Sequence, residues 1–375
     1  MVETEQNELV WVAQPDELER MVKALSAETL LGVDTESNSL FAYQEQVCLI
    51  QFSTAQTDYL VDPLALHDLS SLGPIFANPR IEKIFHAAEY DLVCLKRDFG
   101  FTFANLFDTM LAARILGRAG LGLGSMLQEE FGIAVDKRYQ RADWSKRPIS
   151  AVMMNYARMD THYLIPLRNI LRQQLIAAGR WELAQEDFER LTQVQAGALH
   201  DNGVNCWRIA GAQDLSPRQA AVLMQLCQYR DEQARALNQP AFRVLSNQVL
   251  LEIAQRMPRK RSELNQIAGL SQKLIQRYGA GLLAAVERGI LGPPAYRPYA
   301  PRPDDQLLWR LDVLRNWRKS TARVMGVESD IVLPRDVMEA IAERNPRSLE
   351  ELAAIMAGLP WRFEHFGRQI LELLS

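Results

Sequence analysis

The sequence has few cysteines and no long apolar run, and each shortage excludes a class of protein. Cys48, Cys94, Cys206 and Cys227 are far apart, with no CxxC pair and no histidine at ligand spacing. We therefore expect buried thiols rather than a zinc site or a disulfide framework. No apolar run approaches the roughly 20 residues that cross a bilayer, and the first residues are acidic where a secretory signal is basic. We expect a cytoplasmic protein that does not bind membranes.

Charge is distributed unevenly along the 375 residues. Residues 1–130 contain 8 Lys and Arg against 20 Asp and Glu, a balance of −12, and residues 131–375 contain 34 against 26, a balance of +8. An acidic N-terminal segment followed by a basic remainder is compatible with a protein that binds a polyanion and holds cations on its carboxylates. The chance fusion of an acidic domain to a mildly basic one explains the same numbers. The length indicates two or three domains.

The first half of the chain alternates between strand-like and helix-like segments. Strand patterns occur at residues 9–14, 30–36, 47–53, 57–63 and 83–88. Helix patterns occur at residues 16–30, 89–100, 105–117, 125–132 and 150–179. The second, third and fourth strand patterns are separated only by turn-like segments, which predicts an antiparallel meander. We expect a mixed α/β domain, with a sheet flanked by helices.

Beyond about residue 210 the strand patterns stop, and the tail matches itself at an offset of about 88 residues. LCQYRDEQARALN matches LRNWRKSTARVMG, and EIAQRMP matches AIAERNP, so that Pro258 and Pro346 end equivalent helices. The intervening LGPPAYRPYAPRPDD contains five prolines, which is typical of an extended spacer. The tail is predicted to be two copies of one helical module.

Three acidic features are candidates for chemistry. Asp34 and Glu36 follow the apolar run LLGV, and strand alternation places both carboxylates on one side. Two neighbouring anions need compensation, which a divalent cation supplies through oxygen ligands. Asp91 follows the strand pattern at 83–88, and Tyr156 and Asp160 share a face of a predicted helix because they are four residues apart.

Each feature also has an ordinary explanation when it is taken alone. The pair Asp34 and Glu36 is compatible with a solvated strand end. Asp91 is compatible with a first-turn acid that favours the helix dipole, and Glu89 competes for the same role. Tyr156 and Asp160 fit a helix with a partly buried tyrosine and a surface acid. The combination of all three is what points to a metal site.

In their order and spacing, these motifs resemble the DEDD exonuclease superfamily in its tyrosine-bearing branch, over about residues 8–200. FDTMLAARIL and GIAVDKRYQRADWSKRP resemble the ribonuclease D family within it. YRDEQA and WRKSTA resemble the helicase-and-RNase-D C-terminal (HRDC) module, twice. The resemblance implies an α/β ribonuclease-H-like exonuclease domain at 1–205, all-α HRDC domains at 212–292 and 304–375, and a proline-rich linker at 293–303.

The resemblance also implies a function and its residues. It implies a 3′-to-5′ exoribonuclease that releases 5′-mononucleotides and trims the 3′ ends of precursor tRNA and other small structured RNAs, with no obligate protein partner. Two divalent ions, Mg²⁺ or Mn²⁺, are held by Asp34, Glu36, Asp91 and Asp160, and Tyr156 orients the attacking water. Two alternatives stay open, since the same carboxylates cut DNA and since a relative can keep the fold as a non-catalytic RNA-binding protein.

Other residues are weaker candidates. Substrate contacts are expected from Thr35, His86, Lys137 and Arg141. Gln51 also falls on the family pattern, although an outward-facing strand glutamine explains it as well. Arg158 and Met159 stand where relatives commonly have alanines, and we expect both to face away from the site. The tail is assigned to RNA binding from resemblance and charge, with Tyr229 and Trp317 as core residues rather than base-stacking platforms.

Overall fold

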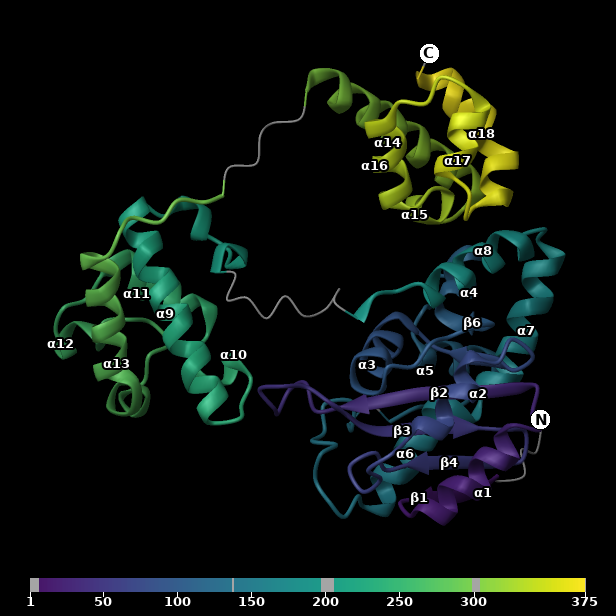
Figure 1. Cartoon of the computed structure of the whole chain (residues 1–375), viewed down its shortest axis with the longest axis horizontal. Helices are drawn as coiled ribbons and strands as arrows, with labels where there is room; N and C mark the ends of the chain where they lie inside the picture. Colours follow the sequence, from purple (N-terminus) through teal and green to yellow (C-terminus); the bar gives the residue numbers. More distant parts are fainter. Residues whose placement is uncertain (1–6, 137, 197–205, 299–303, 375) are drawn as a thin grey trace. The chain divides into compact units, whose positions relative to one another are not determined.

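The computed structural model describes residues 7–136, 138–196, 206–298 and 304–374 (Figure 1). The chain divides into two compact units. The first contains residues 1–37, 47–198 and 302–375, and the second contains residues 38–46 and 199–301. The exonuclease-like sheet and the last helical module therefore belong to one unit, and the first helical module belongs to the other. In the described part of the chain, no helix is both long enough and apolar enough to cross a membrane.

A six-stranded mixed sheet forms the centre of the first unit. Its strands are β1 (Glu8–Val12), β2 (Leu30–Ser37), β3 (Val47–Ser53), β4 (Thr57–Val61), β5 (Glu82–Phe85) and β6 (Leu106–Asp108). The spatial order is β1-β4-β3-β2-β5-β6. β2, β3 and β4 pair antiparallel, as the meander predicted, while β1 runs parallel to β4 and β5 runs parallel to β2 and β6.

Helices cover both faces of this sheet. They are α1 (Pro15–Leu25), α2 (Gly73–Ala77), α3 (Glu89–Phe99), α4 (Thr109–Ile115), α5 (Leu123–Phe131), α6 (Ala151–His162), α7 (Leu164–Ala177) and α8 (Trp181–Thr192). On one face, apolar residues of α1, α2 and α3 share a core with β2 and β3. On the other face, α6 packs against β2, β3 and β4. The expected sheet flanked by helices is confirmed.

Two helix predictions differ from the structure. Residues 105–117 are predicted to form a helix, but Leu106–Asp108 form the edge strand β6, and α4 begins only where Asp108 accepts a hydrogen bond from the Leu111 amide at 3.0 Å. The helix predicted at 150–179 is two helices, which meet at Tyr163. Pro166 explains the break, because proline has no amide hydrogen and its ring clashes with the carbonyl four residues earlier.

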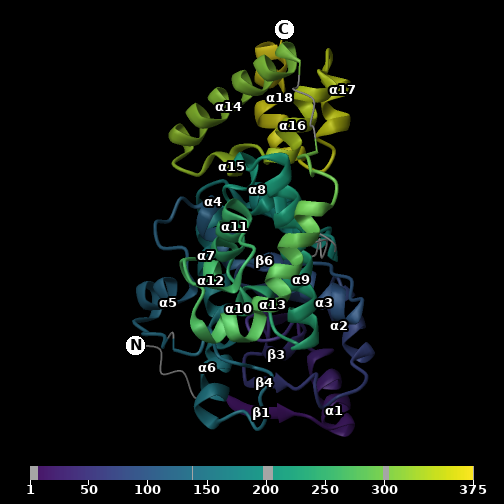
Figure 2. The same ribbon diagram turned by 90° about the vertical axis from the view of Figure 1, so that its left-hand side faces the viewer.

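The tail has no strand in its described residues and consists of two equivalent bundles (Figure 2). The first contains α9 (Pro217–Ala236), α10 (Ala241–Val244), α11 (Asn247–Arg256), α12 (Arg261–Leu264) and α13 (Gln272–Leu291). The second contains α14 (Asp305–Met325), α15 (Ser329–Val332), α16 (Arg335–Arg344), α17 (Leu349–Ile355) and α18 (Pro360–Leu374). The predicted repeat is confirmed.

Equivalent residues make equivalent contacts in the two bundles. Arg230 donates to the Leu245 carbonyl at 3.1 Å, and Arg318 donates to the Leu333 carbonyl at 2.9 Å. Trp317 is buried in its bundle core, and Tyr229 packs against the core of the other bundle. Both aromatic residues are therefore core residues, as expected from their helical spacing.

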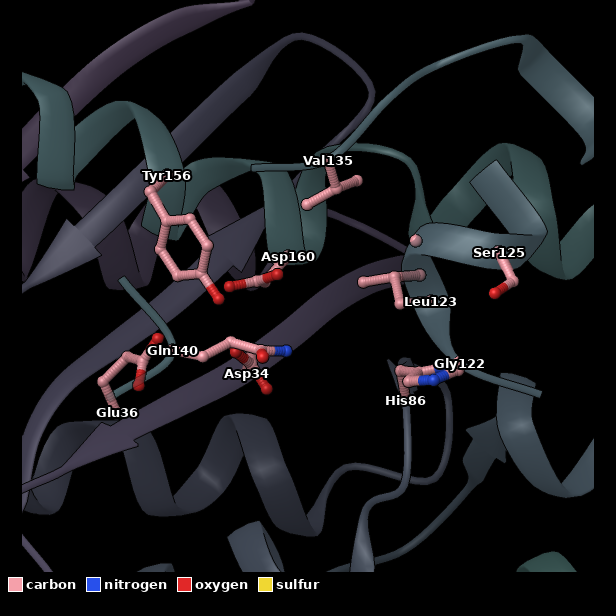
Figure 3. Close-up of a pocket in the computed structure, with 11 residues that line it drawn as sticks. Asp34, Glu36, His86, Gly122, Leu123, Ser125, Val135, Gln140, Tyr156 and Asp160 are labelled. Carbon is pink, nitrogen blue, oxygen red and sulfur yellow. The ribbon is translucent and has the colours of Figure 1, made fainter. Parts of the chain in front are cut away.

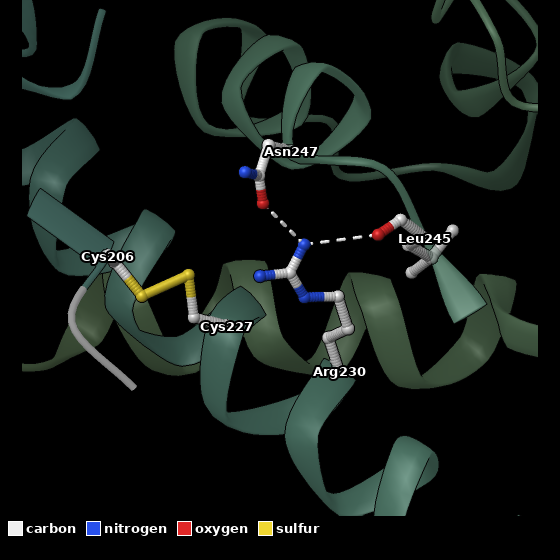
Figure 4. The surroundings of a disulfide bond; sticks show 5 residues. All are labelled: Cys206, Cys227, Arg230, Leu245 and Asn247. Atoms are coloured by element: carbon white, nitrogen blue, oxygen red, sulfur yellow. Dashed lines mark hydrogen bonds between the residues drawn. A yellow bond between two sulfur atoms is a disulfide. The ribbon is translucent and has the colours of Figure 1, made fainter. Parts of the chain in front are cut away.

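One prediction about the cysteines is wrong. Cys206 and Cys227 form a disulfide, with an S–S distance of 2.13 Å (Figure 4). Their separation of 21 residues gave no signal, because the contact arises only when the turn at Cys206–Arg208 packs on α9. Cys48 and Cys94 are buried and lie outside this disulfide, as expected.

Candidate metal centre

The acid pair lies on the central strand β2. Asp34 and Glu36 are two residues apart and face the side of the sheet that α6 covers. Gly32 faces the same side, where a Cβ in place of its hydrogen would lie 2.8 Å from the Thr161 carbonyl oxygen of α6. Any side chain at position 32 would push the helix away. Glycine at this position therefore lets α6 approach the strand that carries the acids.

α6 brings the third acid and the tyrosine to the same place. The helix begins after Ser150, whose hydroxyl accepts a hydrogen bond from the Met153 amide at 3.3 Å. Tyr156 and Asp160 are one turn apart and point toward β2 (Figure 3). One carboxylate oxygen from each of Asp34, Glu36 and Asp160 lies within 4.8 Å of the others. This spacing allows the three side chains to hold one cation.

Asp91 is close to this group but outside it. It lies in the first turn of α3, is 7% exposed, and accepts a hydrogen bond from the Thr35 hydroxyl. Its negative charge raises the pKa of Asp34 and of Asp160, which places it within electrostatic reach of both. The competing residue Glu89 is exposed. Of the two acids in the first turn of α3, Asp91 is therefore the one directed toward the site.

The clustered acids raise one another's pKa. Burial, followed by the charges of the neighbouring acids, raises the pKa of Asp34 and of Glu36 well above the ordinary values. Burial raises the pKa of Asp91 to about 7, and burial together with Asp91 raises the pKa of Asp160 to about 7. Holding all four carboxylates ionised at this place is therefore unfavourable without a compensating positive charge. A divalent cation with oxygen ligands would supply the compensating positive charge.

Aromatic packing fixes Tyr156. Its ring lies 5.8 Å from that of Tyr139 and 6.0 Å from that of the fully buried Trp144. Burial, and then the charges of Asp160 and Glu36, raise the pKa of the phenol above its ordinary value. The hydroxyl therefore stays protonated and can donate a hydrogen bond into the cavity.

Asp34, Glu36, Asp160 and Tyr156 line a cavity of 310 Å³ (Figure 3). Its other lining residues are His86, Gly122, Leu123, Gly124, Ser125, Val135 and Gln140. Gly122 to Ser125 form the start of α5. Sequence reasoning missed this stretch and Gln140, because neither shows a chemical motif. Their position depends on how α5 and the following loop return to the sheet.

The four weaker candidates have different environments. His86 lines the cavity, and its Nδ1 lies 2.9 Å from the Thr109 hydroxyl. That hydroxyl donates to the Phe85 carbonyl at 3.0 Å, so Nδ1 carries the proton that it donates to Thr109. Thr35 points to Asp91 instead of the cavity. Arg141 is exposed and is not among the lining residues, and Lys137 lies outside the described residues.

Arg158 faces away from the cavity, as expected. Its guanidinium donates to Asp58 at 3.1 Å, and His162 also lies 2.8 Å from that carboxylate. Ser53 joins the same group, 2.7 Å from Asp58 and 2.7 Å from Thr161. This buried polar cluster fastens α6 to β3 and β4. Arg158, which stands where relatives commonly have an alanine, therefore helps to hold α6 in place.

Two family models match the chain. A 3′-5′ exonuclease model matches residues 9–176, and an HRDC domain model matches residues 219–286 and 308–374. Ribonuclease D of Desulfotalea psychrophila is 30% identical over 282 residues, covering 74% of this chain and 75% of that protein. RRP6-like protein 1 of Arabidopsis thaliana is 30% identical over 307 residues. This match covers 76% of this chain but only 47% of that relative. The match to RRP6-like protein 2 covers only 34% of that protein.

A solved structure agrees over the whole chain. The crystal structure of Escherichia coli RNase D is 26% identical, covers 99% of both chains and has a TM-score of 0.71. Together with the two family models, this confirms the expected order of an exonuclease domain and two HRDC modules. The chain belongs to the ribonuclease D family.

Proposed function

We propose that this protein is a metal-dependent 3′-to-5′ exoribonuclease that releases 5′-mononucleotides. The observation that carries the proposal is the partly buried group of Asp34, Glu36 and Asp160, whose oxygens lie within 4.8 Å of one another beside the phenol of Tyr156. A group of anions held close together and partly removed from water is unfavourable unless cations compensate their charge. A phosphodiester end placed in the same cavity would meet those cations directly.

The donor set fits magnesium or manganese. All the proposed ligands are carboxylate oxygens, and among the described residues no cysteine or histidine belongs to the group. We propose that Asp34, Glu36, Asp91 and Asp160 hold two such ions, with Asp91 completing the set from α3. When bound, a pair of ions makes a water nucleophilic and stabilises the oxygen that leaves.

The protein's own residues then position the reactants. The protonated hydroxyl of Tyr156 is proposed to hold the attacking water by a hydrogen bond, because burial keeps the phenol neutral. His86 is proposed to contact the substrate from the far side of the cavity. Thr35, Lys137 and Arg141 remain proposed contacts of lower rank, since Thr35 is engaged with Asp91 and Arg141 is exposed.

RNA is proposed as the substrate. The HRDC modules and the balance of +8 over residues 131–375 favour a polyanion. The Escherichia coli structure is described as an exoribonuclease involved in structured RNA processing. By that likeness we propose the 3′ ends of precursor tRNA and other small structured RNAs as targets, in the cytoplasm.

The test uses 3′-labelled RNA and a DNA of matching sequence, each with Mg²⁺, Mn²⁺ or EDTA. We expect mononucleotide release from RNA that requires the metal and is lost in Asp34→Ala. Tyr156→Phe should lower kcat by about 100-fold while Mn²⁺ affinity is unchanged, because the phenol acts on water rather than on the cation. Faster cleavage of DNA would favour a DNA exonuclease. No cleavage by a folded wild-type protein would favour a non-catalytic RNA-binding protein.

A further inference from the structure

Gln51 is a buried amide without a hydrogen-bond partner. It lies in the middle of β3 and is 0% exposed. Among the described residues, neither its Nε2 nor its Oε1 has a partner. Most buried side-chain amides in folded proteins are satisfied, because an unpaired polar group inside a protein is unfavourable. Of the two explanations left open for Gln51, an outward-facing strand glutamine is therefore wrong, and its place on the family pattern stays a prediction.

The strand register places Gln51 beside a proposed metal ligand. Gln51 pairs directly with Asp34 of β2 and, on its other side, with Leu60 of β4. Residues directly opposite in an antiparallel pair point to the same face, with Cβ atoms about 5 Å apart. α6 covers that face, where Ala157 is fully buried. The Gln51 amide is thus enclosed between the sheet, where Asp34 is its neighbour on β2, and α6, the helix that carries Asp160.

Neighbouring residues on the same face do not share this deficit. Two residues further along β3, Ser53 contacts both Asp58 and Thr161 at 2.7 Å. Two residues before Gln51, the fully buried Leu49 packs in the cluster that contains Tyr156. On this face of β3, the positions on either side of Gln51 are thus paired or apolar, and the unsatisfied amide stands opposite Asp34.

We infer that Gln51 is a positioning residue of the metal site, whose Nε2 donates a hydrogen bond to the Asp34 carboxylate in the metal-loaded protein. A carboxylate bound to a cation through one oxygen keeps acceptor capacity on the other, and a neighbouring donor fixes its orientation. The Gln51 Oε1 then accepts from a water molecule of the loaded site. The inference rests on the proposed function, because it requires Asp34 to be a metal ligand.

Gln51→Met tests the role, since methionine has a similar length and no polar group. Full-length wild-type and variant proteins are titrated with Mn²⁺ by calorimetry, and their thermal unfolding is measured in EDTA. We expect the Mn²⁺ Kd to rise about tenfold, the size typical for loss of a partner of a metal ligand. We expect the Tm in EDTA to stay the same or rise, because an unpaired buried amide has been removed. Leu49→Met, on the same strand face, is the matched control and should leave the Kd unchanged.

The outcomes separate the two hypotheses. A Gln51→Met protein with wild-type Mn²⁺ affinity, or with a lowered Tm in EDTA and an unchanged Kd, overturns the role of Gln51 and leaves the proposed function intact. A wild-type protein that does not bind Mn²⁺ overturns both. If Gln51→Met does not fold, glutamine-selective ¹⁵N labelling of the wild type replaces it. A Gln51 side-chain amide signal that shifts on addition of Mg²⁺ supports the inference, and one that does not shift overturns it.

Discussion

Arg362 is predicted to hold the second HRDC module on the exonuclease domain. It lies on α18, is 0% exposed, and donates to Glu186 and Asp187 of α8, each at 2.8 Å. It also donates to the Ile331 carbonyl at 3.1 and 2.8 Å. All of these residues belong to the first unit. Because the two acids are buried as well, replacing Arg362 with methionine would leave two carboxylates without a counter-charge.

The expected loss of unfolding free energy is about 3–5 kcal/mol, the range for removing one partner of a buried ion pair. Arg190→Met is the matched control. Arg190 also joins α8 to the second HRDC module, through an ion pair with Asp336 at 2.9 Å, but this pair lies on the surface. That change should cost about 0–1 kcal/mol. Urea unfolding of the full chain measures both. Adding Glu186→Gln and Asp187→Asn to Arg362→Met should recover most of the loss.

A loss below about 1 kcal/mol in Arg362→Met would refute this reasoning. It would mean that Glu186 and Asp187 are solvated when the arginine is absent, and hence that α18 does not stay packed on α8. A large loss that the added neutral substitutions do not reduce would also count against it, since the effect would then come from packing rather than from charge.

Two further predictions concern the metal centre. Burial raises the pKa of Asp91 and Asp160 to about 7, above the unfolded value of about 3.9, so these acids stabilise the fold only while protonated. In EDTA the Tm should therefore fall as the pH rises from about 4 through 7, and Mn²⁺ should abolish this fall. A Tm in EDTA that rises over this range would contradict the assignment. Gly32→Ala should displace α6, because the new Cβ would lie 2.8 Å from the Thr161 carbonyl oxygen. The free energy of unfolding should fall by about 1–3 kcal/mol, and the affinity for Mn²⁺ should fall as well. Gly358→Ala, whose Cβ meets nothing within 4 Å, is the control, and equal effects of the two substitutions would count against the close approach of α6.

The local parts of the site could be predicted from the sequence. Asp34 with Glu36 follows from the two-residue period of a strand, and Tyr156 with Asp160 follows from the four-residue spacing of a helix. The tail repeat was visible because both copies keep the same helix ends. In each case the signal lies within a few residues, where spacing alone fixes which side chains share a face.

The rest depended on contacts between distant segments. Cys206 and Cys227 are joined only because a turn packs on α9, and Leu106–Asp108 form a strand only because β5 offers an edge. For Gln51, an outward-facing position and the family pattern were equally compatible with the sequence, because its burial comes from α6, which lies about 100 residues later in the chain. Local patterns do not carry this information, since it arises from tertiary packing.

The most direct test of the metal centre is an anomalous difference map from a crystal of this protein soaked in Mn²⁺. We expect two peaks about 4 Å apart, coordinated by Asp34, Glu36 and Asp160, with Asp91 in the coordination shell of one of them. A map without a peak among these carboxylates, or with manganese bound only elsewhere on the protein, would contradict the metal-dependent mechanism.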